Sequence, residues 1–297
     1  MHVVTLPSGA TERFVQANGL RLHVVEAGPP LGPPVVLLHG FPELWYGWRR
    51  QIGPLAAAGH RVIVPDQRGY NTSDKPGGVA AYRIETLVAD VVGLLDAFGL
   101  DRAAVVGHDW GALVSWWLAL VRPERVSRLA VLNVPHPAVM SRNLRKNPRQ
   151  MLRSWYIFFF KVPGLPERLL ALHDFAIMAR VLRGGRRGTF TDADLAVYRE
   201  AWAHPGALTA MVNWYRALLR SVGTRLPRIR VGVPALVLWG ARDLFLGREM
   251  AEQSVALCDD GRLEIFETAT HWLQHDEAEA VNDRLVRFLG HQVAAGQ

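Results

Sequence analysis

One stretch decides the fold of this 297-residue chain: AAVVGHDWG, residues 103–111. Its first four residues form a short apolar run, as in a strand that is buried on both faces of a parallel sheet. Gly107 and Gly111 stand two residues either side of Asp109 and permit a sharp turn into the apolar segment 112–120. The pattern predicts a strand, a tight turn and a helix, with the Asp109 side chain raised into a cleft above the helix N-terminus.

Further apolar runs lie on both sides of this stretch. Val35–Leu38, Val62–Val64 and Leu129–Leu132 have the length of buried strands. Helix-like segments such as Arg83–Phe98 separate several of these runs, and Asn18-Gly19 marks a hairpin near the N-terminus. This alternation predicts an α/β fold, with helices flanking a mostly parallel sheet.

The strand pattern stops at about Pro135 and resumes in the runs Ala235–Trp239 and Leu263–Phe266. The residues between are helix-like and rich in aromatic side chains, which predicts a helical cap inserted into one α/β domain. The expected division is a first part of the core at 1–135, the cap at 136–222 and a second part of the core at 223–297.

Composition limits the kinds of partner that the protein is expected to bind and the cell compartment that it fits. Hydrophobic residues make up 49% of the chain, enough for a sizeable core, and no apolar run is long enough to span a membrane. The net charge of +7 comes mainly from arginines spread along the chain without a nucleic-acid-reading motif. We expect a solvated Arg-rich face, with neither a nucleic-acid nor a membrane partner. The oligomeric state stays open.

The N-terminal segment and the cysteine count favour the cytoplasm. Residues 1–7 lack the basic and apolar parts of a secretory signal. A single cysteine, Cys258, rules out an internal disulfide and fits a reducing compartment.

An aspartate at the turn indicates a particular chemistry. A carboxylate can displace a leaving group at saturated carbon, and water can then cleave the resulting ester at its carbonyl. A serine attacking the same carbon would form an ether, which has no carbonyl at which water could cleave it. Asp109 therefore points to alkyl transfer. The alternative, that Asp109 only caps the helix, is disfavoured by the flanking glycines.

Two later strand ends supply candidates for the acid and the base. Asp243 follows the run 235–238 and His271 follows the run 263–266, which is the chain order expected after such a nucleophile. We expect His271 to act as the general base and Asp243 to orient it. The acid can also follow the run 129–132 in such a fold, but this chain has Asn133 there. We expect His275, one helical turn beyond His271, to be solvated.

The strand end HGFPE, residues 39–43, follows the run 35–38. A loop at this point can supply one backbone N–H of an oxyanion hole, and the residue after the nucleophile the other. These donors would be Phe41 and Trp110. Glu43 is expected to be structural.

Taken together, several segments resemble the soluble epoxide hydrolases of the α/β-hydrolase family. The segments are HGFPE (39–43), DQRGY (66–70), SDKP (73–76), GHDWG (107–111), NVPHP (133–137) and THWLQ (270–274). The resemblance runs from about Val15 to Leu289. In the insert, residues 155–160 and 213–216 resemble the two cap tyrosine segments of that family, which implies that Tyr156 and Tyr215 protonate an epoxide oxygen. Their alternative role is aromatic packing.

The resemblance implies conversion of a small apolar epoxide to a vicinal diol through an ester on Asp109, hydrolysed by water that His271 and Asp243 activate. Haloalkane and haloacid dehalogenases share that nucleophile, but they commonly have Asn in place of Phe41 or Arg in place of Trp110. A non-catalytic receptor on the same fold is the alternative from another class. We expect no metal or organic cofactor, because the chain has no Cys/His cluster or phosphate-binding loop.

Overall fold

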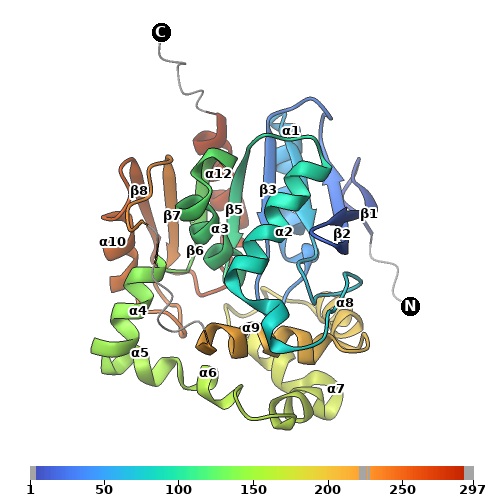
Figure 1. The fold of residues 1–297 in the computed structure, drawn as a ribbon, viewed down its shortest axis with the longest axis vertical. Coiled ribbons are helices and arrows are strands. Elements are labelled where there is room, and N and C mark those ends of the chain that lie inside the picture. The colour runs from blue at the N-terminus through green and yellow to red at the C-terminus, as the bar shows by residue number, and fades with distance from the viewer. Residues whose placement is uncertain (1–4, 221–225, 227, 291–297) are drawn as a thin grey trace.

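The computed structural model describes residues 5–220, 226 and 228–290. Its core is an eight-stranded sheet with the strand order β1-β2-β4-β3-β5-β6-β7-β8 (Figure 1). The strands from β3 to β8 pair in parallel, whereas β1 and β2 form an antiparallel hairpin across Asn18, and β2 pairs antiparallel with β4. The strands are β1 (Thr11–Ala17), β2 (Leu20–Ala27), β3 (Pro34–Leu38), β4 (Arg61–Pro65), β5 (Ala103–His108), β6 (Val126–Leu132), β7 (Ala235–Gly240) and β8 (Gly261–Phe266).

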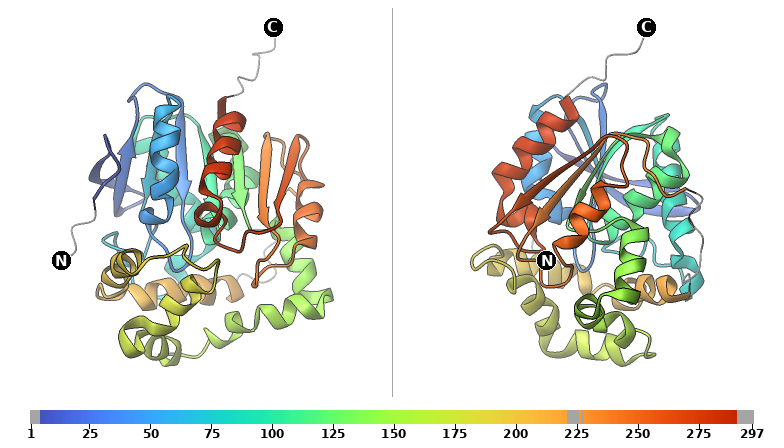
Figure 2. Two further views of the ribbon diagram at one scale, coloured as in Figure 1. Left: turned by 180° about the vertical axis from the view of Figure 1, so that it is seen from behind. Right: turned by 90° about the vertical axis from the view of Figure 1, so that its left-hand side faces the viewer.

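The sequence prediction of an α/β fold is confirmed. Every residue of β5 and β7 is buried, as their continuous apolar runs predict for strands covered on both faces. Helices α1 and α12 cover one face of the sheet, and α2 and α3 cover the other (Figure 2). The core helices are α1 (Arg49–Ala57), α2 (Ile84–Ala97), α3 (Trp110–Val121), α10 (Glu249–Val255), α11 (Leu273–Asp276) and α12 (Ala278–Gly290), with short 3-10 helices at Trp45–Trp48, Val79–Tyr82 and Pro123–Arg125.

Between β6 and β7 the described residues form helices and no strand. We call residues 137–220 the cap. The cap covers the edge of the sheet at which the parallel strands end (Figures 1 and 2). Its helices are α4 (Pro137–Lys146), α5 (Pro148–Arg153), α6 (Trp155–Phe159), α7 (Leu165–Arg183), α8 (Asp192–Trp202) and α9 (Ala207–Arg220). Four residues of α7, 172–175, have non-helical dihedral angles and break it into two parts. The expected end of the insert at Val222 lies outside the described residues.

Local sequence explains several of these boundaries. Pro137, Pro148 and Pro166 stand in the first turns of α4, α5 and α7, where the missing proline N–H costs no helical hydrogen bond. Thr191 begins α8 through a capping box with Asp194. None of the helices in the described ranges is long and apolar enough to traverse a lipid bilayer.

Candidate active site

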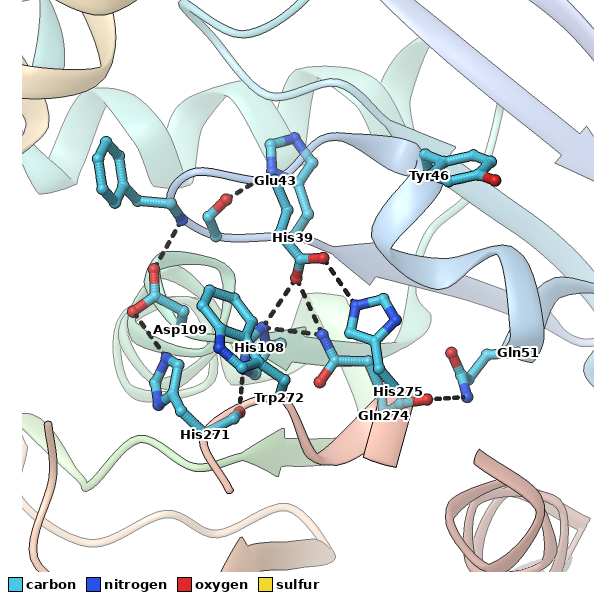
Figure 3. A network of polar contacts seen from close by, with 12 residues as sticks. His39, Glu43, Tyr46, Gln51, His108, Asp109, His271, Trp272, Gln274 and His275 are labelled. Atoms are coloured by element: carbon cyan, nitrogen blue, oxygen red, sulfur yellow. Dashed lines mark hydrogen bonds and ion pairs between the residues drawn. The ribbon is translucent and has the colours of Figure 1, made fainter. Parts of the chain in front are cut away.

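Four of the predicted strand ends meet beneath the cap. Phe41 follows β3, Asp109 follows β5, Asp243 follows β7 and His271 follows β8. Because these strands are parallel, their carboxyl ends lie at one edge of the sheet, and the loops beyond them converge there. Residues that are up to 162 positions apart in the chain, His271 and Asp109, thus lie within 3.5 Å of one another (Figure 3).

Asp109 occupies the turn between β5 and α3 in a strained conformation, with φ 49° and ψ −122°. Its side chain makes no capping hydrogen bond to α3, so the helix-capping alternative is wrong. Gly111 lies so close to the carbonyl of Leu38 that a Cβ atom there would collide with the backbone of β3. The small residue therefore allows α3 to begin against the sheet, directly below the carboxylate.

The two oxygens of Asp109 have different partners. Oδ1 accepts a hydrogen bond of 2.7 Å from the backbone N–H of Phe41. The backbone N–H of Trp110, the next residue, also contributes to lowering the pKa of the carboxyl group. Oδ2 lies 3.5 Å from Nε2 of His271 (Figure 3). Phe41 and Trp110 are the two residues predicted to form an oxyanion hole, and the structure brings both N–H groups to Asp109.

His271 is held from its other side by Asp243. Its Nδ1–H donates to Oδ2 of Asp243 over 2.7 Å. Oδ1 of Asp243 accepts the backbone N–H groups of Phe245 and Leu246 at 2.7 and 3.0 Å. Asn133, at the other possible position for an acid, instead donates its side-chain N–H to Asp243 over 2.8 Å. These bonds hold the carboxylate in place, and the carboxylate sets which nitrogen of His271 carries the proton.

The three charges stabilise one another. Burial lowers the pKa of His271, but the carboxylates of Asp243 and Asp109 outweigh burial and raise the pKa to about 10. Burial raises the pKa of Asp109, but hydrogen bonding and charge attraction from His271 bring that pKa below its usual range. At neutral pH the site therefore holds an imidazolium between two carboxylates.

The two predicted tyrosines face this site from the cap. Tyr156 lies on α6 and Tyr215 on α9, with ring centroids 5.9 Å apart. The Tyr215 ring lies 5.5 Å from Phe41 and 4.9 Å from Trp110, so it packs against both oxyanion-hole residues. Burial, together with the charge of Asp109, raises the pKa of both phenols above the usual value of 10. Both are neutral at physiological pH and retain a proton to donate.

Comparison with known proteins agrees with this geometry. A family model described as the alpha/beta hydrolase fold matches residues 33–278. Epoxide hydrolase A of Mycobacterium tuberculosis is 36% identical, over 94% of this chain and 97% of its own length. The chain belongs to the epoxide hydrolase family of the α/β-hydrolase fold.

Two further relatives extend this family assignment. The AB hydrolase superfamily protein YfhM of Bacillus subtilis is 45% identical, over 96% of this chain and 99% of its own length. The crystal structure of epoxide hydrolase A from Mycobacterium thermoresistibile is 35% identical and matches with a TM-score of 0.84, over 95% of this chain and 98% of that chain.

A cleft of about 400 Å³ reaches the site in this family member. Ile177 and Val181 of α7 line one wall, and Leu244 and Phe245 of the loop after β7 line the other. Of the predicted site residues, His271 is the one that lines this cleft. A larger groove of about 660 Å³, between the first hairpin and helices α2 and α3, contains none of the predicted site residues. No group of three or more His, Cys, Asp or Glu among the described residues is placed to hold a metal ion.

The prediction that His275 is solvated is wrong. It is 1% exposed, and its Nε2 lies 2.7 Å from Oε1 of Glu43. The reason is tertiary: α11 is a single turn folded over the end of the sheet, and Phe190 of the cap packs against the His275 ring at 4.7 Å. Nothing in the local sequence of a four-residue helix reveals what covers it.

Glu43 is the centre of a buried polar network that sequence reasoning did not recognise (Figure 3). Its Oε1 also accepts the Tyr198 hydroxyl of the cap over 2.6 Å. Its Oε2 accepts Nε2 of Gln274 over 2.9 Å and lies 3.3 Å from Nδ1 of His108. His108 in turn donates from Nε2 to the backbone carbonyl of His271 over 2.8 Å. The network thus joins the cap to the backbone of the histidine loop. The only sequence signal was the position of Glu43 and His108 within predicted strand-end motifs.

We expect Glu43→Gln to lower the free energy of unfolding by about 1–3 kcal/mol, because it replaces a buried acceptor with a donor that faces other donors. Urea denaturation followed by circular dichroism measures the change. The matched control is Glu264→Gln, a half-exposed carboxylate paired with Arg284, which should cost less than about 1 kcal/mol. Equal losses in the two variants would contradict the assigned role of the network.

Proposed function

We propose that this protein is an epoxide hydrolase that converts an epoxide to a vicinal diol through a covalent ester on Asp109. One observation carries the proposal: the Asp109 carboxylate lies between two backbone N–H donors, the charged His271 and two neutral cap tyrosines. The relatives named epoxide hydrolases, at 35 and 36% identity over nearly the whole chain, support the substrate class.

In the first step, Oδ2 of Asp109 attacks an epoxide carbon, and the ring C–O bond breaks. The departing oxygen is an alkoxide, too basic to leave readily without a proton, and Tyr156 or Tyr215 donates one. Oδ1 becomes the carbonyl oxygen of the ester and keeps its hydrogen bond to the Phe41 N–H group, with the Trp110 N–H as the second proposed donor. His271 needs no change of charge in this step.

Formation of the ester prepares the second step. It removes the negative charge of Asp109, one of the two carboxylates that raise the pKa of His271 to about 10. The pKa of His271 therefore falls, and the imidazolium loses a proton, which restores the phenol that protonated the epoxide oxygen and leaves a neutral imidazole that can act as a base. His271, oriented by Asp243, takes a proton from water as that water attacks the ester carbonyl carbon. The oxyanion hole stabilises the charge on Oδ1, and the acyl C–O bond breaks to release the diol.

The substrate is a small apolar epoxide. The cleft that includes His271 is lined mainly by apolar side chains, which suits the hydrocarbon part of such a molecule. No step of this mechanism requires a metal or organic cofactor. We also place the protein in the cytoplasm, on the strength of its single cysteine.

A single turnover in ¹⁸O-labelled water tests the covalent mechanism. Label should enter the Asp109 carboxylate and be absent from the first-turnover diol, because the diol takes its second oxygen from Oδ2. His271→Gln should accumulate the alkyl-enzyme ester, visible as a gain of the substrate mass. The buried but distant His60→Gln should turn over without accumulating it. Label appearing directly in the first diol would overturn the mechanism.

Tyr215→Phe separates epoxide from halide chemistry. A halide leaves without a proton, so loss of a phenol should lower epoxide turnover on the order of tenfold or more and spare any haloalkane turnover. Steady-state rates on both substrate types measure the difference. Undiminished epoxide turnover, or measurable activity on haloalkanes alone, would favour a dehalogenase.

Hydrolysis of the ester should accelerate as pH rises, because only neutral His271 can take the proton from water. The midpoint should lie below about 10, the pKa in the free enzyme, since the ester removes the charge of Asp109. Rapid-quench measurement of ester decay across pH gives the profile. A rate that falls with rising pH through this range would show that His271 is not the base.

A further inference from the structure

The positive charge of the protein is concentrated in the cap. Residues 142–187 contain eleven Arg or Lys and two acidic residues, a formal charge of +9. The rest of the chain contains 23 Arg or Lys and 25 acidic residues, a formal charge of −2. The whole net charge of +7 therefore originates in this segment, whose exposed surface we call the cap patch.

The charge of the cap patch is not neutralised by neighbours. All eleven basic side chains are exposed. The two acidic residues, Glu167 and Asp174, pair with Arg216 and Arg199, which lie outside the segment. Among the described residues, acidic partners are found for two of the eleven: Arg183 pairs with Asp192, and Arg186 pairs with Glu277.

The cap patch also exposes large apolar side chains. Eight of the twelve exposed large hydrophobic residues in the described part of the chain lie between Met151 and Ile177. Leu152 is 75% exposed, Trp155 61% and Phe158 58%. Two successive spacings of three residues place these three side chains along one side of α5 and α6. Such a concentration of exposed apolar groups marks an interaction site.

The helices that carry the cap patch form an outer edge of the molecule. In the three views of Figures 1 and 2, α5, α6 and α7 lie at the side farthest from the sheet. Most of the segment that carries the cap patch therefore lies at this outer side, whereas Arg142, Arg145 and Lys146 are on α4, which contacts α10 of the core.

An anionic lipid surface matches this combination of groups. Trp, Phe and Leu side chains enter the boundary between headgroups and acyl chains, while Arg and Lys bind anionic headgroups. Each Arg or Lys near such a surface contributes about 1 kcal/mol. A second copy of this patch would be repelled by a like charge of +9. A nucleic acid can stack on exposed rings such as Trp155 and Phe158, but it offers no partner to an exposed aliphatic side chain such as Leu152.

We propose that the cap patch docks on the surface of a membrane rich in anionic phospholipid. This departs from the expectation, drawn from the sequence, of no membrane partner. Ile177 and Arg180 belong to the cap patch and also line the cleft that His271 lines. An apolar epoxide dissolved in the lipid can thus pass into the cleft from the docked face. This delivery rests on the proposed function, whereas the docking does not.

Sedimentation with vesicles tests the docking. The full chain should bind vesicles of phosphatidylcholine mixed with phosphatidylglycerol, bind neutral phosphatidylcholine vesicles far less, and dissociate as salt is added. Arg149→Glu combined with Arg153→Glu should weaken binding about tenfold or more. Leu152→Ser combined with Phe158→Ser should also weaken binding, because the apolar contribution is lost.

The controls change equally exposed groups outside the cap. They are Arg83→Glu with Arg102→Glu, and Leu31→Ser with Ile229→Ser, and both should bind as the unaltered chain does. Circular dichroism confirms that each variant is folded. An equal loss of vesicle binding in the charge controls would show that binding depends only on the net charge of the protein, and it would overturn the proposal.

Three further results would overturn the docking. One is absence of binding to anionic vesicles. Another is a pair of results for the variant with the two apolar substitutions: it binds polyphosphate or DNA as strongly as the unaltered chain, and it also binds vesicles as strongly as the unaltered chain. The third is a sedimentation coefficient, measured without lipid, that differs between the cap-patch variants and the unaltered chain. Such a difference would mean that a second copy of this chain binds the cap patch. Diol formation from a water-soluble epoxide should be equal in all variants. If neither the variants nor the unaltered chain formed diol, the result would count against the proposed function and not against the docking.

Discussion

The structure of the site depends on the ion pairing of His271 between Asp109 and Asp243. Two carboxylates this close to one imidazole raise its pKa and keep it protonated, and the imidazolium in turn lowers the pKa of Asp109 in a largely buried place. Each charge needs the other two. The strained backbone at Asp109 and the bonds to Asp243 are arranged so that this triad forms. Removing one charge, as an ester does, changes the proton affinity of the others.

Core and cap supply complementary chemistry. In the proposed mechanism the core contributes the anion, the base and the backbone donors at the ends of its strands. The cap contributes Tyr156 and Tyr215, whose burial keeps them neutral. The two parts are joined beside the site through Glu43, which binds Tyr198 of the cap and, through His108, the backbone of His271. The positions of base and proton donors are therefore not independent.

Much of the fold and the candidate triad follow from local signals. An apolar run of four to six residues specifies a buried strand, and glycines two residues either side of Asp109 specify the turn, because both effects act within a few residues. His275 and Glu43 carry no such signal. Their burial results from contacts with Phe190 and Tyr198, which are 85 and 155 residues away and belong to the cap. Local reasoning has no access to such contacts, and it placed His275 in solvent.

The sequence by itself determined the order of strands and helices, the turn that carries Asp109, and the candidate acid, base and tyrosines. The strands, the helices and the turn follow from side-chain periodicity and backbone freedom, which are properties of short segments. The tyrosines follow from the resemblance of two cap segments to those of the epoxide hydrolases. Only the tertiary structure decided which oxygen of Asp109 faces the backbone donors and which faces His271, and that Asn133 supports Asp243. It also gathered a segment of charge +9 and its exposed apolar side chains on one edge of the cap. Distances and burial arise when segments remote in the chain pack together, so no single segment specifies them.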